Sequence, residues 1–99
     1  MTINVERNFE LVTLEITGRL DTTTAPNLEA VINEISEDTK ELIFNMAELE
    51  YISSAGIRVL LSAYKKMNQS GGIMRIEKAN DIVLEVFEMT GLSQMLSRE

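Results

Sequence analysis

The 99-residue sequence contains neither cysteine nor histidine. Without cysteine, the chain can form no disulfide, no thiolate metal site and no thiol nucleophile. Without histidine, it lacks the commonest zinc ligand and the commonest general base, so a serine–histidine catalytic pair is excluded. These absences favour a protein with no metal, no cofactor and no catalytic residues, and we expect it not to be an enzyme.

Long apolar runs and an excess of positive charge are also missing. The longest apolar runs have only a few residues, far short of the ~20 that a membrane-spanning helix needs. Acidic residues outnumber basic ones by 16 to 9, and the net charge of −7 disfavours contact with a phosphate backbone. The N-terminal segment lacks the basic start and apolar stretch of a secretion signal. We therefore expect a cytoplasmic protein that inserts into no membrane and binds no nucleic acid.

The composition that is present is typical of one small globular domain. Hydrophobic residues make up 44% of the sequence and charged residues 25%. A chain of this length buries about 65% of its surface on folding, which is enough for one hydrophobic core. Because no linker, repeat or low-complexity tract divides the sequence, we predict a single domain over residues 1–99.

Two strands and a helix are predicted in the first third of the sequence. Polar and apolar residues alternate over 3–5 and again over 12–16, with Asn8 suited to the hairpin turn between the two strands. We interpret 18–24 as a break, followed by a helix with Thr24 as its N-cap. The helix carries an apolar stripe of helical period, formed by Leu28, Val31, Ile32 and Ile35.

The rest of the sequence alternates strands with helices. A continuous apolar run over 42–46 predicts a strand buried on both faces, and 73–76 predicts another strand. Helices are predicted over about 54–68 and about 80–91, while 92–99 fit either a short strand or a frayed helix. This order predicts an α/β fold. Its sheet is mostly parallel, with four to five strands, an antiparallel N-terminal edge strand and helices from the second strand onward.

Two predicted loops follow strands at their carboxyl ends, where ligands and partners usually bind. One loop covers 19–23, and there Asp21, taken by residue type alone, is a turn former or a helix cap. The other covers 47–53 and leads into small residues at the start of a helix. In one interpretation a serine caps this helix and the small residues allow close packing. In the other, a serine at this helix N-terminus carries a phosphoryl group without unfolding the domain.

The order of elements and three segments resemble the STAS domain, and more closely the single-domain bacterial anti-sigma factor antagonists. The segments are GRLD at 18–21, YISSAGIRVLL at 51–61 and MTGL at 89–92. The resemblance implies a regulatory binding module in which the unmodified antagonist binds an anti-sigma factor, an ATPase-type serine kinase, and thereby frees its sigma factor. Phosphorylation by that kinase ends the binding, and a serine phosphatase restores it.

Carried over by position, the resemblance implies that Ser54 is the phosphoacceptor. Ser53 is the second choice, because it stands where many family members have an aspartate. The resemblance also implies a partner-binding surface made of Asp21, Thr22, Ser53, Ser54, Ala55, Gly56 and Arg58. An alternative function is a STAS subunit of a larger transporter or signalling assembly, without a phosphorylation cycle.

Overall fold

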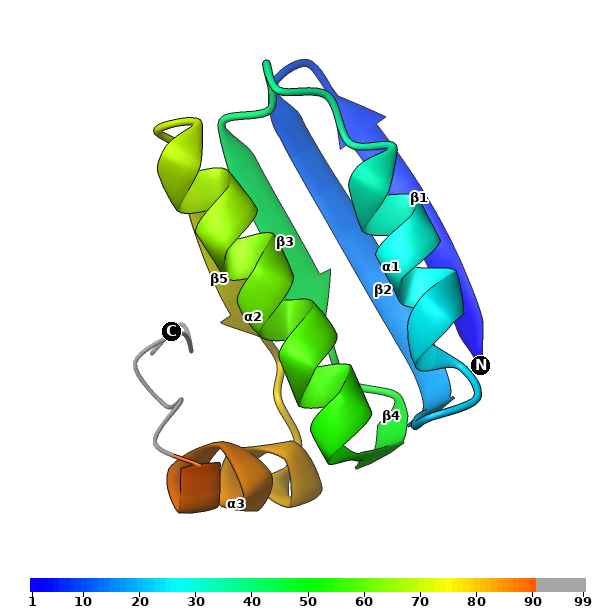
Figure 1. The fold of residues 1–99 in the computed structure, drawn as a ribbon. Helices are drawn as coiled ribbons and strands as arrows, with labels where there is room; N and C mark the ends of the chain where they lie inside the picture. Colours follow the sequence, from blue (N-terminus) through cyan, green and yellow to red (C-terminus); the bar gives the residue numbers. More distant parts are fainter. Residues whose placement is uncertain (91–99) are drawn as a thin grey trace.

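The computed structural model describes residues 1–90, which form an α/β fold (Figure 1). The elements in chain order are β1 (Thr2–Asn8), β2 (Leu11–Leu20), α1 (Ala25–Asn33), β3 (Glu41–Asn45), β4 (Leu49–Ile52), α2 (Ser54–Gln69), β5 (Ile73–Glu77) and α3 (Asp81–Thr90). This order confirms the predicted fold class. The expectation for 92–99 lies outside the described residues.

The sheet is built around β2. Its strand order is β1-β2-β3-β5, with β1 antiparallel to β2 and with β3 and β5 added in parallel. The strand β4 pairs in parallel with the last residues of β2. Because the parallel strands run the same way, the loops that leave their carboxyl ends gather at one edge of the sheet.

The predicted break over 18–24 is wrong in its first part, because β2 continues through Gly18 to Leu20. Gly18 has φ +95°, and the register between β2 and β4 shifts between Gly18 and Arg19. The first half of β2 pairs with β3, and its end pairs with β4. The strand β4 lies inside the predicted loop over 47–53, which is the second correction.

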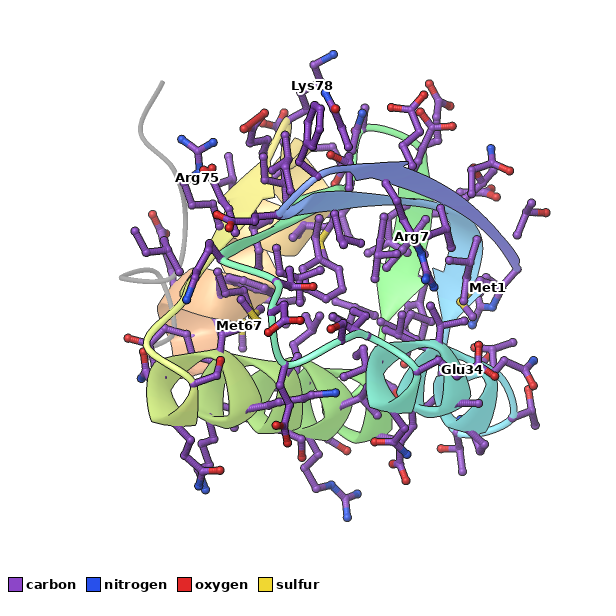
Figure 2. The ribbon with its side chains drawn as sticks, turned by 90° about the horizontal axis from the view of Figure 1, so that it is seen from above. Met1, Arg7, Glu34, Met67, Arg75 and Lys78 are labelled. Carbon is purple, nitrogen blue, oxygen red and sulfur yellow. The ribbon has the colours of Figure 1, made fainter. Side chains whose placement is uncertain are left out.

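The hydrophobic core lies between the sheet and the two helices α1 and α2, which cover the same face (Figures 1 and 2). Side chains of β2 and β3 point into it alternately, as at Leu14 and Phe44, which are neighbours in the sheet and fully buried. As predicted, the strand over 42–46 is buried on both faces, since Ile43 on the opposite face is also buried. Met67, labelled in Figure 2, is buried on the sheet side of α2.

The two helices that cover the sheet are joined at the end of α1. The Nζ atom of Lys66 in α2 donates hydrogen bonds to the carbonyl oxygens of Ile32 (2.8 Å) and Ile35 (3.0 Å). The helix α1 ends at Asn33, before the last residue of its predicted apolar stripe, although Ile35 is still buried. Lys66 therefore adds a charged donor to carbonyl groups at and just after the end of α1, where that of Ile32 also accepts the N–H of Ile35 over 3.1 Å.

Candidate functional site

The two loops that sequence analysis singled out lie side by side at the carboxyl edge of the sheet. Leu20 at the end of β2 is the sheet neighbour of Ile52 at the end of β4. The backbone N–H of Ser53 donates to the carbonyl oxygen of Leu20 over 2.9 Å. Asp21 and Ser53 therefore follow adjacent strands, and the edge that carries the predicted phosphoacceptor also carries the predicted aspartate.

The two serines at the start of α2 differ in exposure. Ser53 is the N-cap residue, and the N–H of Ile57 donates to its carbonyl oxygen over 3.0 Å, but its hydroxyl makes no capping hydrogen bond. The Oγ atom of Ser53 is buried and has no partner among the described residues. Ser54, the first residue of α2, is exposed. Its hydroxyl is therefore the more accessible of the two.

Gly56 lies in the first turn of α2, where it is buried and faces the sheet. A Cβ atom at this position would lie 2.6 Å from Cγ of Leu20 and 3.1 Å from Cγ1 of Ile52. These distances are shorter than van der Waals contact, so only glycine allows the helix to begin this close to the ends of β2 and β4. Gly56 thus lets α2 begin close to the sheet, and this determines where Ser54 lies.

Asp21 organises the loop between β2 and α1, as its residue type alone predicts. Its Oδ1 atom accepts hydrogen bonds from the hydroxyl of Thr23 (2.8 Å), the N–H of Thr23 (3.0 Å) and the N–H of Thr24 (3.2 Å). The hydroxyl bond from Thr23, helped by these backbone N–H groups, lowers the pKa of Asp21 below its ordinary 3.8. The carboxylate is therefore charged at neutral pH and held in one orientation.

Arg19 and Tyr51 also lie at this edge, and sequence analysis assigned them no role. They are neighbours across β2 and β4, and the Arg19 guanidinium carbon lies 4.2 Å from the centre of the Tyr51 ring. The Nε atom of Arg19 is 3.7 Å from Oδ2 of Asp21. No sequence signal pairs the two residues, because their pairing depends on the register shift at Gly18.

A groove between α1 and α2 adjoins the start of α2. It is lined by Thr22, Ala25, Pro26 and Glu29 on one side and by Ala55, Arg58, Val59 and Ser62 on the other. Three of the predicted partner-binding residues, Thr22, Ala55 and Arg58, thus line one surface. Arg58 is exposed and forms no ion pair with any residue in 1–90.

Among residues 1–90, this edge carries an exposed serine but no base paired with its hydroxyl and no metal-binding cluster. Within residues 1–90 no hydrogen bond links the Ser54 hydroxyl to a base, which a serine nucleophile would need. No group of three or more acidic side chains in that range is arranged to hold a metal ion. None of the described helices is long and apolar enough to cross a membrane.

Comparison with known proteins gives a consistent result. The model of the family described as the STAS domain matches residues 2–98. The anti-sigma-B factor antagonist of Bacillus subtilis (strain 168) is 23% identical over 94 residues, which cover 95% of this chain and 86% of that protein. The anti-sigma factor antagonist SpoIIAA in its unphosphorylated form superposes with a TM-score of 0.86 at 20% identity, over 97% of this chain and 86% of that one. The Bacillus protein SpoIIAA in its phosphorylated form gives a TM-score of 0.79 at 19% identity, over 97% and 89%.

Proposed function

Because the chain belongs to the STAS domain family, we propose that it is an anti-sigma factor antagonist controlled by phosphorylation of Ser54. In its unmodified form it binds an anti-sigma factor that is also an ATP-dependent serine kinase, and that factor then releases its sigma factor. Phosphorylation of Ser54 by the kinase ends the binding, and a serine phosphatase restores it. The observation that carries the proposal is the exposed Ser54 hydroxyl at the first residue of α2.

The exposure of the two serines supports Ser54 over Ser53 as the acceptor. A kinase must bring the acceptor oxygen into line with the transferred phosphoryl group, so the hydroxyl must be reachable from solvent. The Oγ atom of Ser53 is buried, whereas Ser54 is exposed. Modification of Ser53 would first require its side chain to turn out of the interior.

The start of α2 is suited to carry a phosphate without loss of the fold. The N-cap residue makes no side-chain hydrogen bond to the first turn, so backbone N–H groups there remain available to an anion. A negative charge near a helix N-terminus stabilises the helix by about 0.3–1 kcal/mol. Because Ser54 is exposed, its phosphate also stays hydrated.

The same phosphate opposes binding of the partner. In the complex, the carboxyl edge of the sheet is covered and a phosphate on Ser54 loses its water. Burial of a charge without a matched counter-charge costs several kcal/mol, and each 1.4 kcal/mol is a tenfold loss of affinity. We therefore expect phosphorylation to weaken binding by about two or more orders of magnitude.

The remaining residues of the proposed partner-binding surface have separate roles. Four residues contact the partner through their side chains, namely Asp21, Thr22, Ala55 and Arg58. The threonines of its loop hold the Asp21 carboxylate in one orientation through hydrogen bonds. Gly56 acts from below, because it lets α2 begin close to the sheet. A substitution at Gly56 is therefore expected to disturb the surface through packing, in addition to any direct contact.

The test is the mass of the intact protein after incubation with a purified anti-sigma factor kinase and ATP. The wild-type chain and Ser53→Ala should each gain one phosphate, whereas Ser54→Ala should gain none and should bind the kinase constitutively. If Ser53→Ala blocks modification and Ser54→Ala does not, Ser53 is the acceptor. If the wild-type chain gains no phosphate, the switch is wrong and the alternative of a STAS subunit in a larger assembly replaces it.

A further inference from the structure

Ser54 and Arg58 lie one helical turn apart on α2. Residues four positions apart in an α-helix are neighbours on its surface, with Cβ atoms about 5–6 Å apart. Helical side chains also lean toward the N-terminus of their helix, so Arg58 is placed where its side chain can reach the turn that begins at Ser54. Both residues are exposed, so neither is held away from the other by burial.

Unlike two other arginines of the chain, Arg58 forms no ion pair or ring contact within residues 1–90. Arg19 lies over the ring of Tyr51 and near the Asp21 carboxylate, and Arg75 pairs with one carboxylate of the neighbouring strand β3 and one of its own strand β5. Arg58 forms no such pair within residues 1–90, although Glu29 of α1 lines the same groove. Among the described residues, the unmodified protein therefore has a guanidinium with no ion-pair partner one turn from the proposed phosphoacceptor.

We propose that Arg58 is the internal counter-charge for a phosphate on Ser54 and pairs with it along the surface of α2. The inference rests on the proposed function in taking Ser54 as the phosphoacceptor. A phosphate offers three acceptor oxygens and up to two negative charges, and the planar guanidinium can donate two parallel hydrogen bonds to such a group. Arg58 thereby acts as a positioning residue, because it fixes the phosphate and transfers nothing.

The other charged groups near Ser54 leave Arg58 as the main side-chain partner of a phosphate there. The Asp21 carboxylate on the adjacent loop repels a phosphate, and Glu29 competes with the phosphate for Arg58. Arg19 could attract the phosphate, but its guanidinium is already held by Tyr51 and Asp21. The N–H groups of the first turn attract the phosphate equally in every variant of Arg58.

This pairing gives phosphorylation a second effect on the surface. In the unmodified protein, Arg58 is free to donate hydrogen bonds to a carboxylate of the partner. Once Ser54 is phosphorylated, the same guanidinium is occupied by the phosphate of its own helix. The modification then withdraws a positive charge from the partner at the same time as it adds negative charge.

The experiment installs phosphoserine at position 54 of the full chain during synthesis, so that no kinase is needed. The phosphorus resonance is titrated by NMR in the wild-type sequence, in Arg58→Gln and in the matched control Lys65→Gln. Lys65 is exposed on the same helix but lies about 16 Å from Ser54 along the helix axis. Because a cation favours the doubly charged phosphate, Arg58→Gln should raise the second pKa of the phosphate by about 0.1–0.4 pH units, and Lys65→Gln should leave it unchanged.

Equal phosphate pKa values in the wild-type chain and in Arg58→Gln would overturn the inference. Equal rises in Arg58→Gln and Lys65→Gln would also overturn it, because the effect would then be general to the charge of the helix. A second measurement needs no substitution: the Nε–H resonance of Arg58 should move together with the titration of the phosphate, and a static resonance contradicts the pairing. Since the phosphate is installed without a kinase, these outcomes do not depend on whether a kinase modifies Ser54.

Discussion

At the scale of single residues, the two oxygens of the Asp21 carboxylate serve different purposes. Oδ1 accepts the hydrogen bonds that shape the loop before α1, from the backbone and hydroxyl groups of Thr23 and Thr24. Oδ2 accepts none of these bonds and lies 3.7 Å from the Nε atom of Arg19, with which it forms an ion pair. One residue can therefore order the loop and still offer an acceptor to a partner.

The lowered pKa of Asp21 predicts a stability that depends on pH. Because the folded protein holds the charged form, this contribution is present above the ordinary pKa of 3.8 and is lost as the pH falls through the lowered value in the fold. Thermal unfolding should show Asp21→Asn to be less stable than the wild-type chain at pH 7, and the gap should close in acid. The matched control Asp38→Asn, at an exposed loop position, should unfold like the wild type at every pH. A gap that persists unchanged at the lowest pH would contradict the role of the charge.

Gly56→Ala is predicted to destabilise the fold even though alanine favours helices. The added Cβ atom would meet Cγ of Leu20 at 2.6 Å, and this branching atom of the side chain cannot move aside as freely as its end. Overpacking of this kind costs about 1–3 kcal/mol, against a gain of about 1 kcal/mol in helix propensity. The melting temperature should fall by about 4–8 °C for each net kcal/mol, whereas Ser54→Ala at the exposed neighbouring position should leave it nearly unchanged.

At the scale of elements, periodicity predicted the helices and β2, because each buries one regular face, and the alternation of apolar residues also predicted β1, although only Ile3 of that strand is partly buried. The short strand β4 escaped prediction because its buried residues, Leu49 and Ile52, are three positions apart and fit no strand alternation. The end of β2 escaped because Gly18 resembles a turn residue, whereas here it accommodates a register shift with φ +95°. Both elements are held by their pairing with each other, which no local pattern encodes. For the site, the sequence motif indicated that the start of α2 carries the functional residues. It could not show that Gly56 faces the sheet, because that depends on how β2, β4 and α2 pack together.

Lys66 links α1 to α2, so its loss should weaken the packing of one helix on the other. In Lys66→Met the carbonyl of Ile35 loses the charged donor and that of Ile32 keeps only the N–H of Ile35, while hydrogen bonds to charged groups contribute about 1.5–3 kcal/mol. Chemical denaturation should show Lys66→Met to be about 1–3 kcal/mol less stable than the wild type. Lys65→Met, at the exposed neighbouring position, should differ by less than about 0.5 kcal/mol. Equal stability of the two variants would show that the bonds are replaced by water without cost.

At the scale of the whole molecule, the net charge of −7 predicts that the protein does not bind duplex DNA. Binding to duplex DNA draws most of its affinity from cations that replace the counterions of the phosphates, and this chain offers an excess of carboxylates. The isolated protein should show no saturable binding to duplex DNA at about 150 mM salt in a fluorescence anisotropy titration. Saturable binding under those conditions would contradict this prediction, and the proposed function through protein partners would then have to include direct contact with DNA.

The site exists only in the folded chain, because it depends on the pairing of β2 with β4. Asp21 and Ser53 are 32 positions apart in the sequence, with α1 and β3 between them, and they follow strands that pair only in the folded chain. A chain emerging from the ribosome, or one that has unfolded, displays Ser54 without this arrangement. Under the proposed switch, an enzyme that recognises the two residues together would modify folded molecules and pass over immature or damaged ones.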